Sequence, residues 1–171
     1  DQDKVGNQGW NDLADFEIGQ TVPYRYESNM PDVNGYNTYY YAWHDVMSEA
    51  LTFKKDSVAI RIYESSNARN YYELKEGEFE VKEAPGGGDT FQVIVSDMKK
   101  IIDREFNRKN EAGENKYGQK IVLTYQATLN EKAAKNTGRP GFENDVRLEF
   151  SNDPDSAVRG STGYTPWDIV V

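Results

Sequence analysis

Apolar and polar residues alternate along several segments of the chain at the two-residue period of a β-strand. The period is cleanest in TFQVIVS (90–96), DSVAIRIYE (56–64) and KIVLTYQATLN (120–130), where every second side chain is apolar. Such segments bury one face and expose the other. Three further segments bring the prediction to at least six strands: 18–28, in which Ile18, Val22, Tyr24 and Tyr26 share the inward face, 141–150 and 167–171.

Two polar side chains fall on faces that are otherwise suited to a core. In GFENDVRLEF (141–150), Asn144 shares one face with four apolar side chains, while the charged residues occupy the other face. In YYYAWHDVMSEALTF (39–53), Asp45 lies in register with Tyr41 and other large apolar residues. A buried polar group needs a hydrogen-bond partner, and an isolated buried carboxylate is more stable protonated than charged. The pattern alone therefore predicts a hydrogen-bonded Asn–Asp pair that closes a corner of the core.

The remaining pattern predicts an all-β architecture with one short helix. Turn sequences rich in Gly, Pro, Asn and Asp separate the alternating segments. Ser96 is expected to cap a helix, because apolar residues follow it at helical spacing between 98 and 106. Mostly antiparallel strands with one helix indicate an antiparallel β-sandwich, and Pro23 favours an edge position for the first strand. Residues 1–171 contain no internal repeat or long linker, so we expect a single domain.

Composition argues against several classes of function. Twenty basic residues against 29 acidic ones give a net charge of −9, which disfavours binding to nucleic acid or to an anionic membrane. The chain has one histidine, His44, and no cysteine, so we expect no zinc site, no Cys/His catalysis and no cofactor. His44 itself is expected to lie at the surface or half-buried in a strand. No apolar run approaches the roughly 20 residues of a membrane span, so no membrane insertion is expected.

Two glycine-rich or acidic segments have simple structural interpretations. GGG at 86–88 lacks the Lys-Ser/Thr of a phosphate loop and favours a hairpin turn. SNDPDSAVRG (151–160) has alternating carboxylates, but it lacks the spaced glycine and the distal glutamate of a calcium loop. An Asp-rich turn is the favoured interpretation, and no metal site is predicted.

The tyrosine-rich segment YNTYYYAW (36–43) leaves two interpretations open. Tyr and Trp supply contact area in binding sites, so the segment could form a platform for a glycan or a host protein. The same residues pack well in strands, and this second interpretation is favoured. A hydrolase with paired carboxylates such as Asp45 and Glu49 is supported only by the abundance of acidic residues.

Four segments follow one another in an order that is more specific than any of them alone: DFEIGQTVPYRYES, YYYAWHDVMSEALTF, IVLTYQATLNEKA and ENDVRLEFSNDP. This order resembles the isopeptide-forming fimbrial domain of Gram-positive pilus shaft proteins, which is related to the A-type domains of collagen-binding adhesins. The likeness spans nearly the whole chain. It implies an immunoglobulin-like β-sandwich of the collagen-adhesin A type.

The resemblance also gives the inward-facing polar residues a purpose. In that family a lysine near the start of the domain joins an asparagine near its end, and an aspartate promotes the reaction. Carried over by position, the lysine is Lys4, the asparagine is Asn144 and the aspartate is Asp45. Such a domain is not an enzyme, because it turns over once and on itself. The cross-link would give a chain without cysteines a covalent staple.

We therefore expect a structural domain of a pilus backbone or surface adhesin, located outside the cell on the wall or pilus of a Gram-positive bacterium. Neighbouring pilin subunits or domains are the expected partners. The alternative is an adhesin module of the same fold that binds a glycan or a host matrix protein. The chain contains no "L-P-x-T-G" sorting signal or convincing "Y-P-K" pilin motif, so we expect one domain cut from a longer surface protein.

Overall fold

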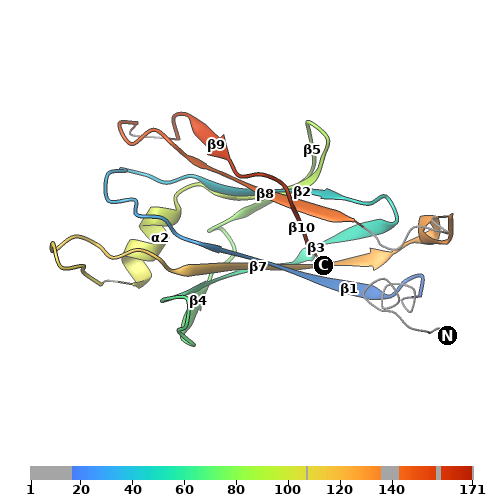
Figure 1. The fold of residues 1–171 in the computed structure, drawn as a ribbon. Helices are drawn as coiled ribbons and strands as arrows, with labels where there is room; N and C mark the ends of the chain where they lie inside the picture. The colour runs from blue at the N-terminus through green and yellow to red at the C-terminus, as the bar shows by residue number, and fades with distance from the viewer. Residues whose placement is uncertain (1–16, 107, 136–142, 157–158, 171) are drawn as a thin grey trace.

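The alternating segments form two antiparallel sheets in a computed structural model, which describes residues 17–106, 108–135, 143–156 and 159–170. One sheet has the strand order β1–β7–β3–β4, and the other has the order β10–β8–β2–β6–β5, with β9 also paired to β8. Figure 1 shows the sheets as two layers, with β8 and β2 above β7 and β1. The predicted antiparallel β-sandwich with one short helix is confirmed. The strands of the described residues are β1 (Thr21–Asn29), β2 (Tyr41–Met47), β3 (Leu51–Tyr63), β4 (Tyr71–Glu73), β5 (Glu80–Gly86), β6 (Asp89–Val95), β7 (Lys120–Leu129), β8 (Asn144–Ser151), β9 (Thr162–Tyr164) and β10 (Asp168–Ile169).

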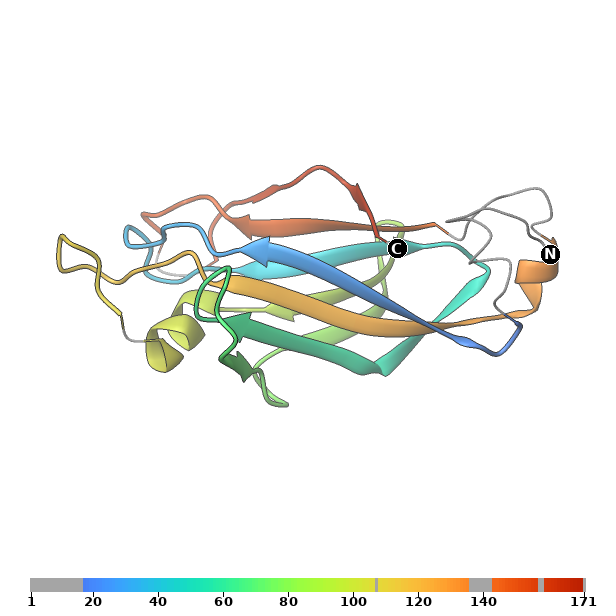
Figure 2. The same cartoon turned by 60° about the horizontal axis from the view of Figure 1, so that its bottom comes forward.

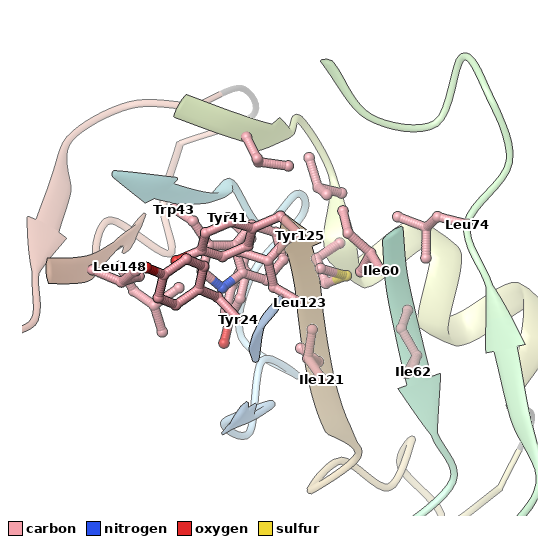
Figure 3. Close-up of a cluster of buried hydrophobic side chains, with 14 of the residues drawn as sticks. Tyr24, Tyr41, Trp43, Ile60, Ile62, Leu74, Ile121, Leu123, Tyr125 and Leu148 are labelled. Atoms are coloured by element: carbon pink, nitrogen blue, oxygen red, sulfur yellow. The ribbon is translucent and has the colours of Figure 1, made fainter. Parts of the chain in front are cut away.

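The core lies between the sheets and is built from the faces that the alternation predicted. Every odd position of β7 from 121 to 129 is buried, and so are the predicted inward residues of β6. Figure 3 shows part of this cluster, in which large aromatic side chains lie among aliphatic ones. Its largest fully buried members include Trp43, Tyr125, Phe91, Ile60 and Ile62. Burial of these apolar side chains stabilises the fold.

β1 lies at the edge of its sheet, as Pro23 indicated. It pairs with β7 along its whole length, and Pro23 lies opposite Gln126. In Figure 2, β1 runs beside β7 along the length of the sandwich. Ile18 was expected on the inward face of this strand, but it precedes the strand and is 54% exposed. The chain turns at residues 17–20 before it enters the sheet, which takes Ile18 out of register.

The single α-helix among the described residues, α2 (Met98–Glu105), begins one residue later than the sequence suggested. Asp97, not Ser96, is the N-cap, and its side chain accepts a hydrogen bond from the backbone N–H of Lys100. The same carboxylate accepts the backbone N–H of Tyr39 at 3.0 Å, so it also ties the helix to the chain that leads into β2. The apolar face of the helix is buried as predicted.

The glycine run forms the hairpin between β5 and β6, as predicted. Gly86, Gly87 and Gly88 have φ angles of 107°, 69° and 89°. These angles lie in the left-handed region that glycine adopts without a steric penalty. The segment is therefore a turn.

Candidate functional site

Asp45 and Asn144 meet in the core, as their sequence positions predicted. β2 and β8 are neighbours, and their register places Asp45 opposite Val146 and Met47 opposite Asn144. The two polar side chains therefore sit diagonally on the inward face of one sheet. Asp45 is 1% exposed and Asn144 is completely buried.

Tyr125 of the opposite sheet completes the cluster. Its hydroxyl donates a hydrogen bond to Asp45 Oδ2 at 2.7 Å. The Asn144 side-chain nitrogen donates to the same hydroxyl oxygen at 2.5 Å. The alternating pattern does not indicate this role, because a tyrosine counts as apolar in it. The available signal was that a phenol in the middle of a buried strand needs a hydrogen-bond partner.

Aromatic rings exclude water from these three side chains. The Tyr24 ring stacks on the Tyr125 ring with centroids 5.5 Å apart, and the Phe91 ring meets Tyr125 edge-on at 5.1 Å. Phe53 stacks on Phe91 and closes the cluster on that side. The polar cluster therefore sits in an environment of low dielectric constant, where a charge is costly.

This environment favours the neutral form of Asp45. Its pKa is raised from 3.8 to about 8: burial is the largest cause, the nearby carboxylates of Asp145 and Asp89 add to the increase, and the hydrogen bonds with Tyr125 and Asn144 oppose it. Burial and the adjacent Asp45 also raise the pKa of the Tyr125 phenol above its ordinary value. Both groups are therefore protonated at neutral pH.

The protonation state of Asp45 decides which way the Asn144 carboxamide faces. The amide atom that faces Asp45 lies 2.6 Å and 2.7 Å from its two oxygens. An ionised carboxylate accepts hydrogen bonds only, and it would require the amide nitrogen to face it. A neutral Asp45 instead donates to the amide oxygen, while the amide nitrogen donates to Tyr125 and Tyr125 donates back to Asp45. This closed ring satisfies all three groups and polarises the Asn144 carbonyl.

Lys4, the predicted partner of Asn144, lies outside the described residues. Among the described lysines, Lys54 and Lys55 are exposed and Lys120 is half-buried. Lys120 lies over the Tyr63 ring, with its nitrogen 4.7 Å from the ring centroid. None of these three side chains is buried in the core with Asn144.

A second polar cluster lies on the outer face of the same sheet and corrects two predictions. His44 is buried: its Nδ1 lies 2.6 Å from Asp89 Oδ2, and its Nε2 lies 2.9 Å from Glu149 Oε1. Glu149, expected to face water, is 3% exposed and accepts hydrogen bonds from Arg159 and Thr162, each at 2.5 Å. Burial alone would raise the pKa of Glu149, but the hydrogen bonds from Thr162, His44 and Arg159 hold it below its ordinary value.

The chain after β8 explains this unexpected burial. Residues 159–164 return along β8, and the Tyr164 ring lies edge-on to His44 with centroids 5.5 Å apart. The Arg159 guanidinium lies over the Tyr40 ring at 4.0 Å. A two-residue period cannot predict that a later segment covers the polar face of a strand. The hydrogen bonds of Arg159 and Thr162 to Glu149 hold the returning segment against the sheet.

The tyrosine-rich segment is packed within the fold, with Tyr39, Tyr41 and Trp43 in the core and Tyr40 covered by Arg159 on the outer face, which confirms the favoured interpretation. The side chains of Tyr39, Tyr40, Tyr41 and Trp43 are all buried. Tyr41 packs edge-on against Trp43, with ring centroids 5.2 Å apart. The segment therefore does not present these rings to a ligand.

The sequence matches the model of one protein family, described as Gram-positive pilin backbone subunit 2, Cna-B-like domain, over residues 18–154. The chain belongs to this family. The family description names a B-like domain, whereas the motifs of the sequence resemble the A type. No curated protein matches the chain.

Solved structures of pilus backbone proteins share the fold. A structure of the pilus backbone RrgB from Streptococcus pneumoniae aligns with a TM-score of 0.51 at 21% identity, over 81% of this chain and 44% of that one. The full-length major pilin RrgB aligns with a TM-score of 0.53 at 21% identity, over 82% and 20% of the two chains. The pilus 2b backbone protein of group B streptococcus aligns with a TM-score of 0.52 at 15% identity, over 88% and 52%. The chain spans about half the length of these pilins or less.

The family description names a pilin backbone subunit, which is a structural protein.

Within the part of the chain that the structure describes, no helix is both long enough and apolar enough to cross a membrane.

Proposed function

We propose that the chain is a structural domain of a Gram-positive pilus backbone, and that it cross-links itself through an amide between Lys4 and Asn144. The observation that carries this proposal is the dry cluster in which Asp45, with its raised pKa, faces the Asn144 carboxamide. Family membership supports the pilus role and a location on the cell wall or pilus surface. Neighbouring pilin subunits or domains are the partners of such a domain.

Amide exchange requires an amine, a polarised amide carbonyl and an acid; the cluster supplies the last two, and Lys4 would supply the amine. A lysine in apolar surroundings loses its proton, because desolvation disfavours the charged form, and the neutral amine is a nucleophile. Its nitrogen attacks the side-chain carbonyl carbon of Asn144, while Asp45 donates a hydrogen bond to the oxygen on which negative charge develops. Asp45 then relays one proton from the lysine nitrogen to the departing amide nitrogen. A new C–N bond forms, the old one breaks, and ammonia leaves without any oxidant or cofactor.

Lys4 can reach the cluster. Residues 17–20 lie at the end of the sandwich where β7 ends, since Gly19 N–H donates to the Leu129 carbonyl at 2.7 Å. Asn144 begins β8 at this same end, where Glu143 accepts the Ser48 N–H and the turn after Ser48 leads into β3 beside Leu129. Position 17 lies 13 steps along the chain from Lys4 (17 − 4), a span of about 40 Å when extended. The site is therefore well within reach of this part of the chain.

The bond would serve a mechanical purpose. It would join the chain ahead of β1, in one sheet, to the first residue of β8, in the other sheet. It would close a loop of 140 residues (144 − 4), and the chain-entropy argument for cross-links gives a stabilisation of roughly 5 kcal/mol for a loop of that size. A pull along the shaft would then be borne by covalent bonds in addition to hydrogen-bond ladders.

The proposal is tested by detecting the amide bond and identifying the two residues that it joins. Intact mass spectrometry of the purified chain should give a mass lower than the sequence mass by one ammonia. Fragmentation should place the modification between Lys4 and Asn144. Lys4→Arg, which keeps the charge but not the amine, should restore the full mass, whereas Lys54→Ala at an exposed lysine should not. A Lys4→Arg chain that still lacks one ammonia would overturn the assignment of the lysine.

A further inference from the structure

One buried hydroxyl beside the proposed reaction site has no partner. Tyr24 is 4% exposed, and its hydroxyl makes no hydrogen bond among the described residues. Buried polar groups in proteins are nearly always hydrogen-bonded, and each exception calls for a specific explanation. By contrast, the hydroxyl of the equally buried Tyr41 donates to Ser28 Oγ at 2.8 Å.

The geometry of the β1–β7 pair directs this hydroxyl toward the cluster. Tyr24 lies directly opposite Tyr125 in the register, and their rings stack at an interplanar angle of 22°. Two nearly parallel rings on adjacent strands and the same face carry their hydroxyls into the same layer of the core. Figure 3 shows both side chains together in the buried cluster.

Electrostatics agree with this placement. Burial raises the pKa of Tyr24 to about 12, and the nearby Asp45 contributes to the increase. Tyr24 is therefore close enough to Asp45 for the two groups to interact electrostatically. Its phenol stays neutral at any physiological pH. A neutral phenol oxygen is a hydrogen-bond acceptor.

The other polar atoms of the cluster are already engaged. Tyr125 donates to Asp45 and contacts the Asn144 carboxamide, which also lies against both Asp45 oxygens. An amine that enters this site brings N–H groups that also need acceptors in a dry environment. The Tyr24 oxygen is an unoccupied acceptor in this layer.

We propose that Tyr24 positions the nucleophile: its hydroxyl oxygen accepts a hydrogen bond from the Lys4 amine. This inference rests on the proposed cross-linking function. The hydrogen bond would hold one N–H aside, so that the nitrogen lone pair points at the Asn144 carbonyl carbon. After the new C–N bond has formed and ammonia has left, the single remaining N–H of the amide would keep the same acceptor.

The rate of cross-linking tests this role. The chain is produced by cell-free synthesis, samples are quenched in acid at intervals, and the fraction lacking one ammonia is read by intact mass. Tyr24→Phe keeps the ring and removes only the hydroxyl. We expect cross-linking to be slower by on the order of tenfold, the effect of losing one hydrogen bond of about 1.4 kcal/mol. Tyr41→Phe is the matched control and should cross-link at the wild-type rate.

A stability comparison separates this role from ordinary packing. Tyr24→Phe should lower the free energy of unfolding of the cross-linked chain, but should leave that of a Lys4→Ala chain unchanged or raised, because there the hydroxyl has no partner. An equal loss in both chains would mean that Tyr24 is structural, and wild-type cross-linking kinetics in Tyr24→Phe would also overturn the inference. A wild-type chain with full mass would instead overturn the proposed function itself.

Discussion

Replacing Asp45 with asparagine in a chain that cannot cross-link should remove most of the pH dependence of its stability between about pH 4 and pH 8. In the Lys4→Ala background, Asp45 keeps the buried position in which its pKa is raised from 3.8 to about 8. In the unfolded chain the same carboxyl ionises near its ordinary pKa. Across this window the unfolded state therefore binds fewer protons than the native state, so stability falls as pH rises.

The size of the effect follows from the pKa shift. A pKa difference of one between the folded and unfolded chains corresponds to 1.36 kcal/mol of stability. The rise of the Asp45 pKa from 3.8 to about 8 therefore changes the free energy of unfolding by roughly 6 kcal/mol across the whole window. This contribution is fully present below the unfolded pKa and is lost as pH rises through the folded pKa near 8. Asparagine has nearly the same shape and no charge, so Asp45→Asn should be more stable than its parent by several kcal/mol at the upper end of the window.

Urea unfolding at closely spaced pH values, followed by tryptophan fluorescence, measures this directly, because Trp43 is fully buried in the native core. The parent Lys4→Ala chain should lose stability steadily across the window, and the Asp45→Asn chain should stay nearly flat. Asp56→Asn, at an exposed position of β3, is the control and should follow the parent. Parallel curves for Asp45→Asn and its parent would show that Asp45 is ionised in the folded chain, and would refute the argument for a neutral acid.

Four further outcomes can be checked with the same methods. Lys4→Ala, Asp45→Ala and Asn144→Ala should each abolish the cross-link and lower the melting temperature without unfolding the chain, and retention of the cross-link by any of them would disprove that residue's role. Tyr125→Phe should slow cross-linking, because Asp45 loses its hydrogen-bond donor; wild-type kinetics by intact mass would contradict this. Glu149→Gln should cost about 1–3 kcal/mol in urea unfolding, because buried hydrogen bonds to a charged group are weakened. The lowered pKa of Glu149 should make its contribution present above its unfolded pKa and lost as pH falls, so the stability difference between Glu149→Gln and wild type should shrink in acid.

The sequence was sufficient to predict the strands that bury one face along their whole length. Apolar and polar residues alternate along β6 and β7, and the odd-numbered positions were correctly predicted to be buried. β4 and β9 are only three residues long, and β5 is exposed along most of its length, so none of them has a two-residue period to detect. The predicted N-cap was one residue too early, because Ser96 and Asp97 are both favourable N-cap residues. Only the fold decides which side chain accepts the N–H groups of the first helical turn.

The same limits apply to the site. The two-residue period alone placed Asp45 and Asn144 on inward faces, because the residues two positions away on the same face of each strand are large and apolar. Tyr125 was not predicted as their partner, because it comes from the opposite sheet, and contacts across the core depend on how the two sheets are stacked. The burial of His44 depends on a segment more than 100 residues later in the chain, which no local pattern reports. The pairing of Lys4 with Asn144 stays a prediction.

The central claim is that the chain forms an amide within its own core, and the intact mass of the purified protein tests it most directly. The account predicts a mass one ammonia below that of the sequence, with Lys4 and Asn144 recovered as a linked pair after digestion. A mass equal to that of the sequence would contradict it. Asn144 would then be a hydrogen-bonded core residue, and the Asp45–Asn144–Tyr125 cluster would have only a structural role.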